Sequence, residues 1–146
     1  MSRGFYGNVQ VGATVTIPWA TNDSNGASVT RATDGTISVY KDANATQVTT
    51  GVTDTEDFDS LTGVHWVTID TSADSDFYSL GSMFHVVLSG ATIDGQTVNH
   101  PIASFAIGEM IGVTSTAADN ADNVALVNRA LSIMGEGSIS SLADTD

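Results

Sequence analysis

The chain has 146 residues, a length that suits one domain, and its hydrophobic fraction of 41% can supply a modest core. It contains no cysteine, which excludes disulfide bonds, thiolate chemistry and zinc sites that need sulfur ligands. Seventeen acidic and four basic residues give a formal net charge of −13, and nucleic-acid binding, which requires clustered cations, is not expected.

Through the first hundred or so positions, apolar and polar residues alternate, which is the pattern of strands with one buried side and one solvent-facing side. Residues 1–12 are rich in glycine and form either an edge strand or an arm that adds to a neighbouring subunit. The strands predicted after them, in chain order, are 14–18, 36–41, 47–52, 64–70, 83–89, 96–98 and 102–107. Turn residues such as Asn25-Gly26 and Asp94-Gly95 separate these segments.

The segment 64–70 is apolar on both sides, so we expect it to be a central strand. Trp66 lies on it and is the residue that we expect to fill the core, because large aromatic side chains bury the most surface. We further expect Phe77 and Tyr78 to anchor the loop that follows, and Phe58 with Leu61 to anchor the acidic segment before it.

Because no segment with helical periodicity lies between these strands, βαβ units are not expected. The fold class that we predict is all-β: an antiparallel β-sandwich, either immunoglobulin-like or jelly-roll, with a C-terminal α-helix. The sequence does not choose between the two topologies.

After Ser115 the apolar spacing becomes helical. A stripe of Val124, Val127, Leu131 and Met134 predicts one amphipathic helix, and Gly135 is placed to end it. A helix beyond a finished sandwich needs a surface that covers its apolar stripe, either on its own domain or on another subunit. We therefore divide the chain into an N-terminal arm (1–13), a sandwich domain (14–110) and a C-terminal helical docking segment (111–146).

Two groups of acidic residues are candidate Ca²⁺ sites, since hard cations take several carboxylate oxygens. They are Asp54, Glu56, Asp57 and Asp59, and then Asp70, Asp74 and Asp76. Neither group has the spacing and glycine of a helix–loop–helix calcium site, and solvated acidic loops explain both. We predict no metal site and no cofactor.

The three histidines offer little support for catalysis. His65 and His85 lie on predicted strands as half-exposed residues, and His100 belongs to a turn before Pro101. The chain has no nucleophile elbow, no zinc-protease motif, no phosphate-binding loop and no dinucleotide fingerprint. We predict no catalytic residues and no enzyme activity.

The aromatic residues allow a further alternative, a platform for sugars. They are Phe5, Tyr6, Trp19, Tyr40, Trp66 and Tyr78. Their positions within strands favour packing over ligand binding. Trp19, directly after Pro18, is the one that we expect near a surface or a contact.

Several short motifs between residues 14 and 108 resemble, in order, a β domain that recurs in structural proteins of tailed bacteriophages. They are Val39-Tyr40-Lys41-Asp42, Asp57-Phe58-Asp59, Thr62-Gly63, Val67-Thr68-Ile69-Asp70-Thr71, Phe77-Tyr78 with Gly81, Val86-Val87-Leu88 and Asp94-Gly95. The resemblance implies a place in a virion and no defined reaction.

The segment 125–146 is similar to the opening helix and turn of phage head–tail adaptor proteins. The matching features are Asn128-Arg129-Ala130-Leu131, Gly135-Glu136, Ile139 and Ser141-Leu142. Because the chain ends where the helical bundle of an adaptor would continue, this resemblance implies a docking segment or part of a fusion.

Together these patterns predict a non-enzymatic structural protein of a tailed-phage particle, assembled in the host cytoplasm and located in the virion. The expected partners are capsid, portal or adaptor proteins, with the chain forming a homo-oligomer or occurring in many copies on the particle. The residues expected to contact them are Trp19, Val124, Val127, Leu131 and Met134. No signal peptide is expected, because no apolar run follows Met1-Ser2-Arg3-Gly4-Phe5, and no membrane span is expected, because no stretch approaches about 18 apolar residues. The alternative function is a carbohydrate- or receptor-binding module of a tail fibre.

Overall fold

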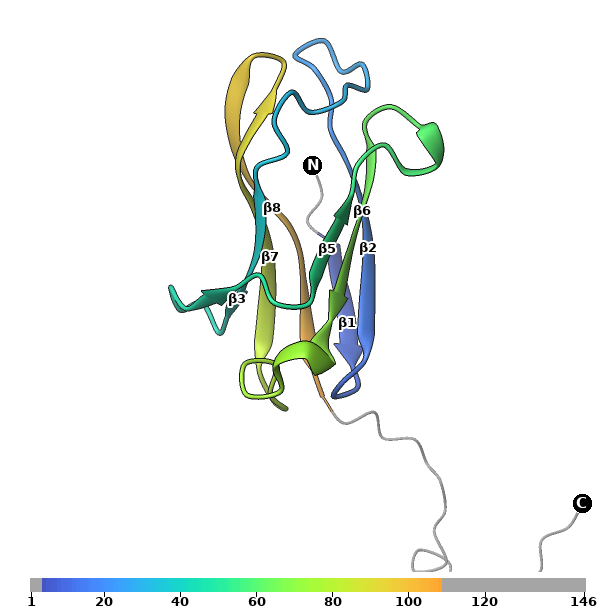
Figure 1. The fold of residues 1–146 in the computed structure, drawn as a ribbon. Coiled ribbons are helices and arrows are strands. Elements are labelled where there is room, and N and C mark those ends of the chain that lie inside the picture. The colour runs from blue at the N-terminus through green and yellow to red at the C-terminus, as the bar shows by residue number, and fades with distance from the viewer. Residues whose placement is uncertain (1–3, 109–146) are drawn as a thin grey trace, which may run out of the picture. The chain divides into compact units, whose positions relative to one another are not determined.

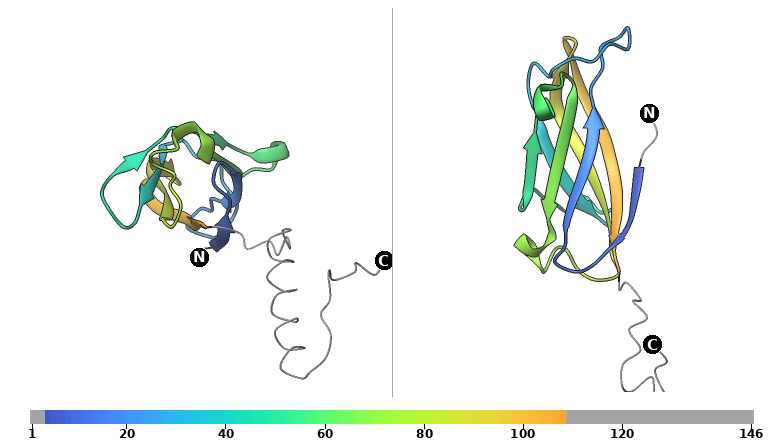
Figure 2. Two further views of the ribbon diagram at one scale, coloured as in Figure 1. Left: turned by 90° about the horizontal axis from the view of Figure 1, so that it is seen from below. Right: turned by 90° about the vertical axis from the view of Figure 1, so that its right-hand side faces the viewer.

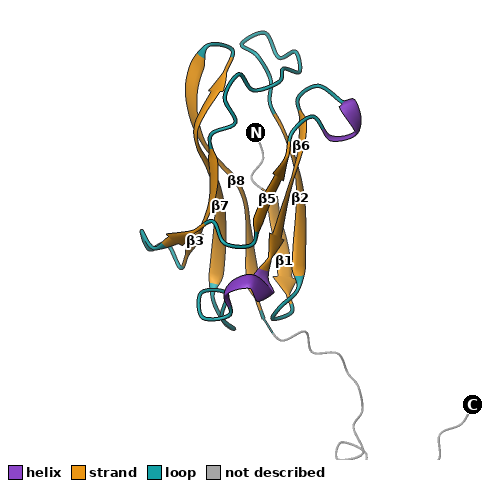
Figure 3. Cartoon of the chain, in the orientation of Figure 1, coloured by secondary structure: helices purple, strands orange, loops and turns teal. Residues whose placement is uncertain are grey.

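The computed structural model describes residues 4–108, and the predicted C-terminal helix with its four contact residues lies outside them. This part of the chain consists of strands joined by turns and two short 3-10 helices (Figures 1 and 3). The elements are β1 (Gly4–Val9), β2 (Thr14–Ala20), β3 (Thr36–Lys41), β4 (Gln47–Val48), β5 (Val52–Thr55), η1 (Phe58–Ser60), β6 (Val64–Asp70), η2 (Thr71–Asp74), β7 (Met83–Ile93) and β8 (Gln96–Ile107). No helix in this part is long and apolar enough to cross a membrane.

The strands form two sheets that enclose one core (Figure 2). A five-stranded sheet has the order β1-β8-β7-β3-β4, and a three-stranded sheet has the order β2-β6-β5. Neighbouring strands are antiparallel, except that β1 runs parallel to β8. The all-β prediction is confirmed. Of the two interpretations of the N-terminal residues, the edge strand is observed for Gly4–Val9.

The predicted strands 36–41 and 64–70 agree with β3 and β6, and β6 is the central strand of its sheet as expected. The predicted strand 47–52 is wrong, because the chain crosses here from one sheet to the other and forms β4 and β5. Gly51 lies at the crossing with a φ of 77°, and a Cβ there would come within 2.4 Å of the Asp70 carbonyl oxygen. A side chain is therefore excluded at this crossing.

The two short strands predicted at 96–98 and 102–107 form a single strand, β8. Pro101 does not interrupt it, because the register between β7 and β8 shifts between Val86 and Val87, where Pro101 is paired. Such irregularities accommodate a residue that has no N–H to donate.

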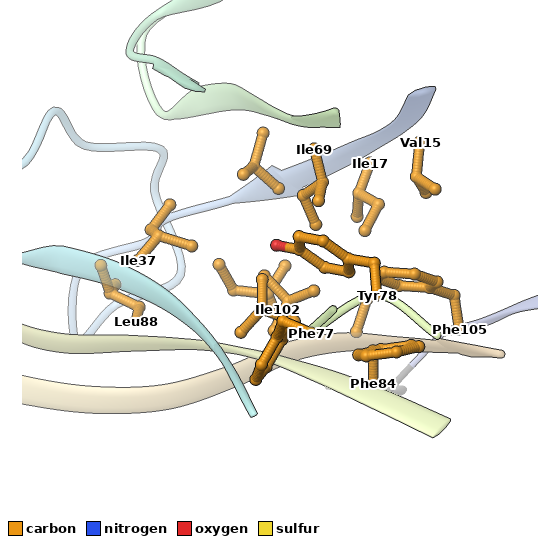
Figure 4. Close-up of a cluster of buried hydrophobic side chains, with 14 of the residues drawn as sticks. Val15, Ile17, Ile37, Ile69, Phe77, Tyr78, Phe84, Leu88, Ile102 and Phe105 are labelled. Carbon is orange, nitrogen blue, oxygen red and sulfur yellow. The ribbon is translucent and has the colours of Figure 1, made fainter. Parts of the chain in front are cut away.

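Tyr78 is the largest fully buried side chain and lies between the two sheets (Figure 4). Its ring contacts Phe77 and Phe84, and its hydroxyl donates to the Thr50 carbonyl oxygen over 3.3 Å. Burial, followed by the nearby Asp74 and Asp70 carboxylates, raises the pKa of Tyr78 to about 12. Phe77 and Tyr78 therefore anchor the loop before β7, as predicted from the sequence.

Trp66 does not fill the core, and this prediction is wrong. Along β6 the buried residues are His65, Val67 and Ile69, so Trp66 lies on the outer side of the three-stranded sheet. There its ring packs against Phe58, with 4.6 Å between the ring centroids. Because side chains alternate along a strand, the register that buries Val67 necessarily turns Trp66 outward.

This assignment predicts different costs for two aromatic deletions. Phe84→Ala removes a fully buried ring that stacks on Phe105 and should lower the free energy of unfolding by about 3–5 kcal/mol. Trp66→Ala should cost clearly less, because the ring is partly exposed on the outer face. Urea denaturation followed by circular dichroism measures both values, and an equal or larger loss for Trp66→Ala would contradict the assignment.

Candidate functional site

Three connections meet at one end of the sandwich, opposite the end where β8 finishes (Figure 1). They are the long β2–β3 connection (21–35), the β5–β6 loop (56–63) and the β7–β8 turn at Asp94-Gly95. We call this the loop end. Loops held by a rigid scaffold commonly carry function, so its construction decides what the domain can do.

The long connection is fastened to the β7–β8 hairpin. The Ser24 N–H donates to the Asp94 carboxylate over 3.1 Å, and this bond lowers the pKa of Asp94 below its usual value. Further along, Thr33 and Thr92 form an isolated antiparallel bridge, in which the Thr92 N–H donates to the Thr33 carbonyl oxygen over 3.0 Å. A segment without regular structure of its own therefore has a fixed path.

Asp57 fastens the same connection to the β5–β6 loop. Its carboxylate accepts hydrogen bonds from the Thr30 hydroxyl and from the Gly63 N–H, the latter over 2.7 Å. These two bonds, the Thr30 bond first, hold the pKa of Asp57 below its usual range. Asp57, Asp59 and Ser60 all have a positive φ, which non-glycine residues rarely adopt. The loop is thus held in a strained conformation by hydrogen bonds to its neighbours.

Beneath these loops the interior of the sandwich changes from aliphatic to polar. On the inner side of the three-stranded sheet, the pairs Val15–Ile69 and Ile17–Val67 are followed by the pair Trp19–His65. The guanidinium of Arg31, from the long connection, is inserted against this last pair. We call Arg31, Trp19 and His65, with the carboxylates that face Arg31, the polar layer.

Arg31 is the centre of the polar layer, although only 4% of the residue is exposed. Its Nε donates to Glu56 over 3.0 Å, and its Nη1 donates to the Asp34 carbonyl oxygen over 2.9 Å. Its Nη2 lies 2.7 Å from an Asp54 carboxylate oxygen, without the alignment of a hydrogen bond. Two carboxylates therefore neutralise one buried cation, as burial of a charge requires.

Trp19 packs between the other members of the layer. The Arg31 guanidinium carbon lies 4.9 Å from the centre of the indole ring, and the His65 ring centroid lies 4.5 Å away. The indole N–H is buried and has no hydrogen-bond acceptor among residues 4–108. The structure places Trp19 partly inside the sandwich, where it lines two small cavities of about 230 and 170 Å³. Its contact with a partner stays a prediction.

His65 is completely buried, which corrects the expectation of a half-exposed residue. Its Nε2 lies 2.7 Å from the Thr21 hydroxyl, and its Nδ1 accepts from the Asp57 N–H over 3.2 Å. These partners fit a neutral ring with its proton on Nε2. Burial first, and Arg31 second, lower the pKa of His65 against the opposing effect of Asp57, Glu56 and Asp54.

The residues considered for chemistry are not brought together. His65 is in the polar layer, whereas His85 is half-buried, as expected, and lies 2.8 Å from the Ser104 hydroxyl. Of the first acidic group, Asp54 and Glu56 face Arg31. No group of three or more His, Cys, Asp or Glu among the described residues could hold a metal ion. The contacts of the polar layer join the long connection to β5 and β6.

The rigid loop end presents two large apolar side chains to solvent. Phe58 is 41% exposed and Leu61 is 54% exposed. Phe58 is supported from below by Trp66, so this half of the predicted anchor packs on the sheet while its other side stays open. Exposed apolar side chains on a fixed loop are typical of contact surfaces.

Sequence reasoning missed Arg31 as the central residue of this end. A signal was present, because Val52, Asp54 and Glu56 alternate, which is the spacing that places side chains on the same side of an extended chain. Two carboxylates on the same side of the chain as an apolar residue require a cation nearby. The chain has only four basic residues, so few candidates for this cation existed.

Comparisons of the chain with protein families, with curated proteins and with solved structures found no match.

The buried neutral state of His65 predicts a pH dependence of stability. Because the folded pKa lies below that of the unfolded chain, about 6.5, the unfolded state binds the proton more readily. The free energy of unfolding should therefore fall as the pH decreases from about 6.5 toward the folded pKa.

Urea denaturation at several values from about pH 8 to pH 5 measures this loss. His65→Gln should flatten the curve in that range, whereas the control His85→Gln, at a half-buried site, should keep the wild-type slope. An unchanged slope in His65→Gln would show that another group titrates.

Proposed function

We propose that the chain is a non-enzymatic structural protein of a tailed-phage particle, docking on the capsid shell or at the head–tail neck. The observation that carries the proposal is the loop end, where a buried ion-paired layer fixes three loops and leaves Phe58 and Leu61 exposed. In this domain, buried polar side chains hold the loops in place. Preorganised loops suit a protein that binds partners during assembly, because they lose less conformational entropy on binding.

The resemblance of residues 14–108 to a β domain of phage structural proteins supports the virion context. Three of its motifs lie at the loop end: Asp57-Phe58-Asp59 and Thr62-Gly63 in the β5–β6 loop, and Asp94-Gly95 in the β7–β8 turn. The partners that we propose are capsid, portal or adaptor proteins, met in the host cytoplasm during assembly. Many copies per particle would add weak contacts into strong attachment.

The strand order supports the immunoglobulin-like alternative over the jelly-roll. In immunoglobulin-type sandwiches, strands B, E and D form one sheet, and strands C, F and G belong to the other. The orders β2-β6-β5 and β8-β7-β3 correspond to these sets. Tyr78, shortly before β7, also occupies the place of the tyrosine that marks this corner of such folds.

We further propose that the C-terminal segment supplies a second attachment. The stripe of Val124, Val127, Leu131 and Met134 lies outside the described residues, and its support is the sequence periodicity and the resemblance to head–tail adaptors.

The loop-end contact predicts a defect in assembly without a defect in folding. The double substitution Phe58→Ser and Leu61→Ser should abolish incorporation into particles, because it removes the exposed apolar surface. Leu80→Ser is the matched control, since Leu80 is 51% exposed but lies in the loop before β7. Variants are supplied in trans to particles that lack the protein, and incorporation is quantified on purified particles by immunoblot.

The thermal unfolding midpoint of each variant shows whether the domain still folds. Wild-type incorporation of a folded double variant would contradict the loop-end contact. The number of copies per wild-type particle separates the two locations, because a neck position predicts about a dozen copies and a capsid shell many more.

The second attachment predicts that Leu131→Asp abolishes incorporation and leaves the sandwich folded, because a carboxylate cannot be buried in an apolar contact. Glu136→Asp, which conserves charge outside the stripe, is the control. Circular dichroism and the immunoblot report folding and incorporation separately. Unfolding of the sandwich in Leu131→Asp would instead place the stripe on the core of its own domain.

A further inference from the structure

The five-stranded sheet has an incomplete edge beside β3. β4 consists of two residues, and its pairing with β3 begins at Val39. On the other side of β3, the Asp42 N–H donates to the Met83 carbonyl oxygen over 2.8 Å. The main-chain N–H and C=O groups of the even-numbered residues of β3 therefore face β7. The N–H and C=O of Ile37 therefore face away from β7, at a position where no described strand lies beside them.

The free edge of β5 lies across from this gap. The Asp70 N–H donates to the Gly51 carbonyl oxygen over 2.9 Å, so the odd-numbered residues of this strand face β6. The main-chain groups of Asp54 therefore face away from β6. Ile37 and Asp54 both line an open cavity of about 380 Å³ between the edges of the two sheets.

The lining of this cavity is acidic. Asp34, Asp54 and Glu56 line it together with one cationic residue, Arg31, which leaves a formal excess of two negative charges. Arg31 is already engaged by Asp54 and Glu56. Asp34 meets Arg31 only through its main-chain oxygen, so its carboxylate is outside these ion pairs and exposed to solvent. A cationic side chain complements this opening, and an anionic one is repelled.

The edge of β2 provides a contrast, because it is protected. The Thr71 N–H donates to the Ala13 carbonyl oxygen, so the odd-numbered residues face β6 and Pro18 faces the free edge. Pro18 has no N–H, and its carbonyl oxygen accepts from the Tyr6 hydroxyl over 3.5 Å. Proline is a common device that prevents strand addition. The stretch Thr36–Ser38 of β3 has no partner strand on the side away from β7 among the described residues, and it carries neither proline nor a charged residue, although Ile37 and Ser38 are only 6% and 5% exposed.

We propose that this edge accepts an extended segment of a partner protein, added as a strand along Thr36–Ser38, with a lysine or arginine side chain directed into the acidic cavity. In such additions the main-chain hydrogen bonds provide affinity, and the pocket for a side chain provides specificity. The inference rests on the proposed assembly function, of which it specifies one partner contact.

The test uses the full chain labelled with ¹⁵N and two synthetic peptides with blocked ends. Both peptides consist of serine and threonine around one central residue, which is lysine in the probe and glutamate in the matched peptide. The lysine peptide should shift the amide resonances of Ile37 and Asp54. The glutamate peptide should bind at least about fivefold more weakly, the effect of about 1 kcal/mol from one charge contact.

Asp34→Lys should weaken binding of the lysine peptide about fivefold, and Asp34→Asn should weaken it less. Asp76→Lys, an exposed carboxylate in the loop after η2, is the control and should leave the affinity unchanged. The dispersion of the amide spectrum verifies that each variant is folded. Equal binding of both peptides, resonance shifts elsewhere, or no shift at saturating peptide would overturn the proposal.

This outcome is distinguishable from failure of the proposed function. If peptide binding fails while the loop-end variants still abolish incorporation, the edge site is wrong and the assembly function stands. If the peptides bind as expected while all variants are incorporated normally, the edge site stands and the docking of the loop end is wrong.

Discussion

The buried guanidinium of Arg31 is the interaction on which the loop end depends. A cation in the interior is tolerated only with close counter-charges, and losing one partner of such a group costs about 3–5 kcal/mol. Asp54 and Glu56 supply the counter-charges from adjacent inner positions at the end of β5. The long connection, which forms no strand of a sheet, is therefore held at this end by the ion pairs of Arg31, in addition to its hydrogen bonds to Asp57 and to the β7–β8 hairpin.

A chain of side-chain contacts connects Arg31 to the β5–β6 loop. Its guanidinium lies against Trp19, Trp19 lies against His65, and the His65 ring accepts from the Asp57 N–H. Asp57 in turn holds the β5–β6 loop in a strained conformation, with Phe58 next to it. The exposure of Phe58 and Leu61 is thus a consequence of interior packing, which connects the core to the proposed contact surface.

The fold was predictable where one uninterrupted run of alternating apolar and polar residues formed one strand. β3 and β6 agree with the predicted bounds because alternation alone defines them. The crossing at Gly51 was missed, since alternation continues through it while the strand changes sheets. Trp66 was assigned to the core because both sides of β6 are apolar, and only its register with β2 decides which side is buried. Long-range pairing is the information that a local pattern lacks.

The candidate site was less predictable, because its members come from four separate segments. From the sequence we named Trp19, His65, Asp54 and Glu56 for other roles, and we did not single out Arg31, which brings them together. The same carboxylates also have two roles, since Asp54 and Glu56 neutralise Arg31 and line the open cavity at the edge of β3. Substituting either one would both loosen the loops and alter the cavity, so a change in binding could not be attributed to one of the two surfaces. Asp34 contacts Arg31 only through its main-chain carbonyl oxygen, and a residue of any other type at this position has the same oxygen. The edge of the sheet can therefore be altered through Asp34 while the polar layer stays intact, and this separates the two surfaces experimentally.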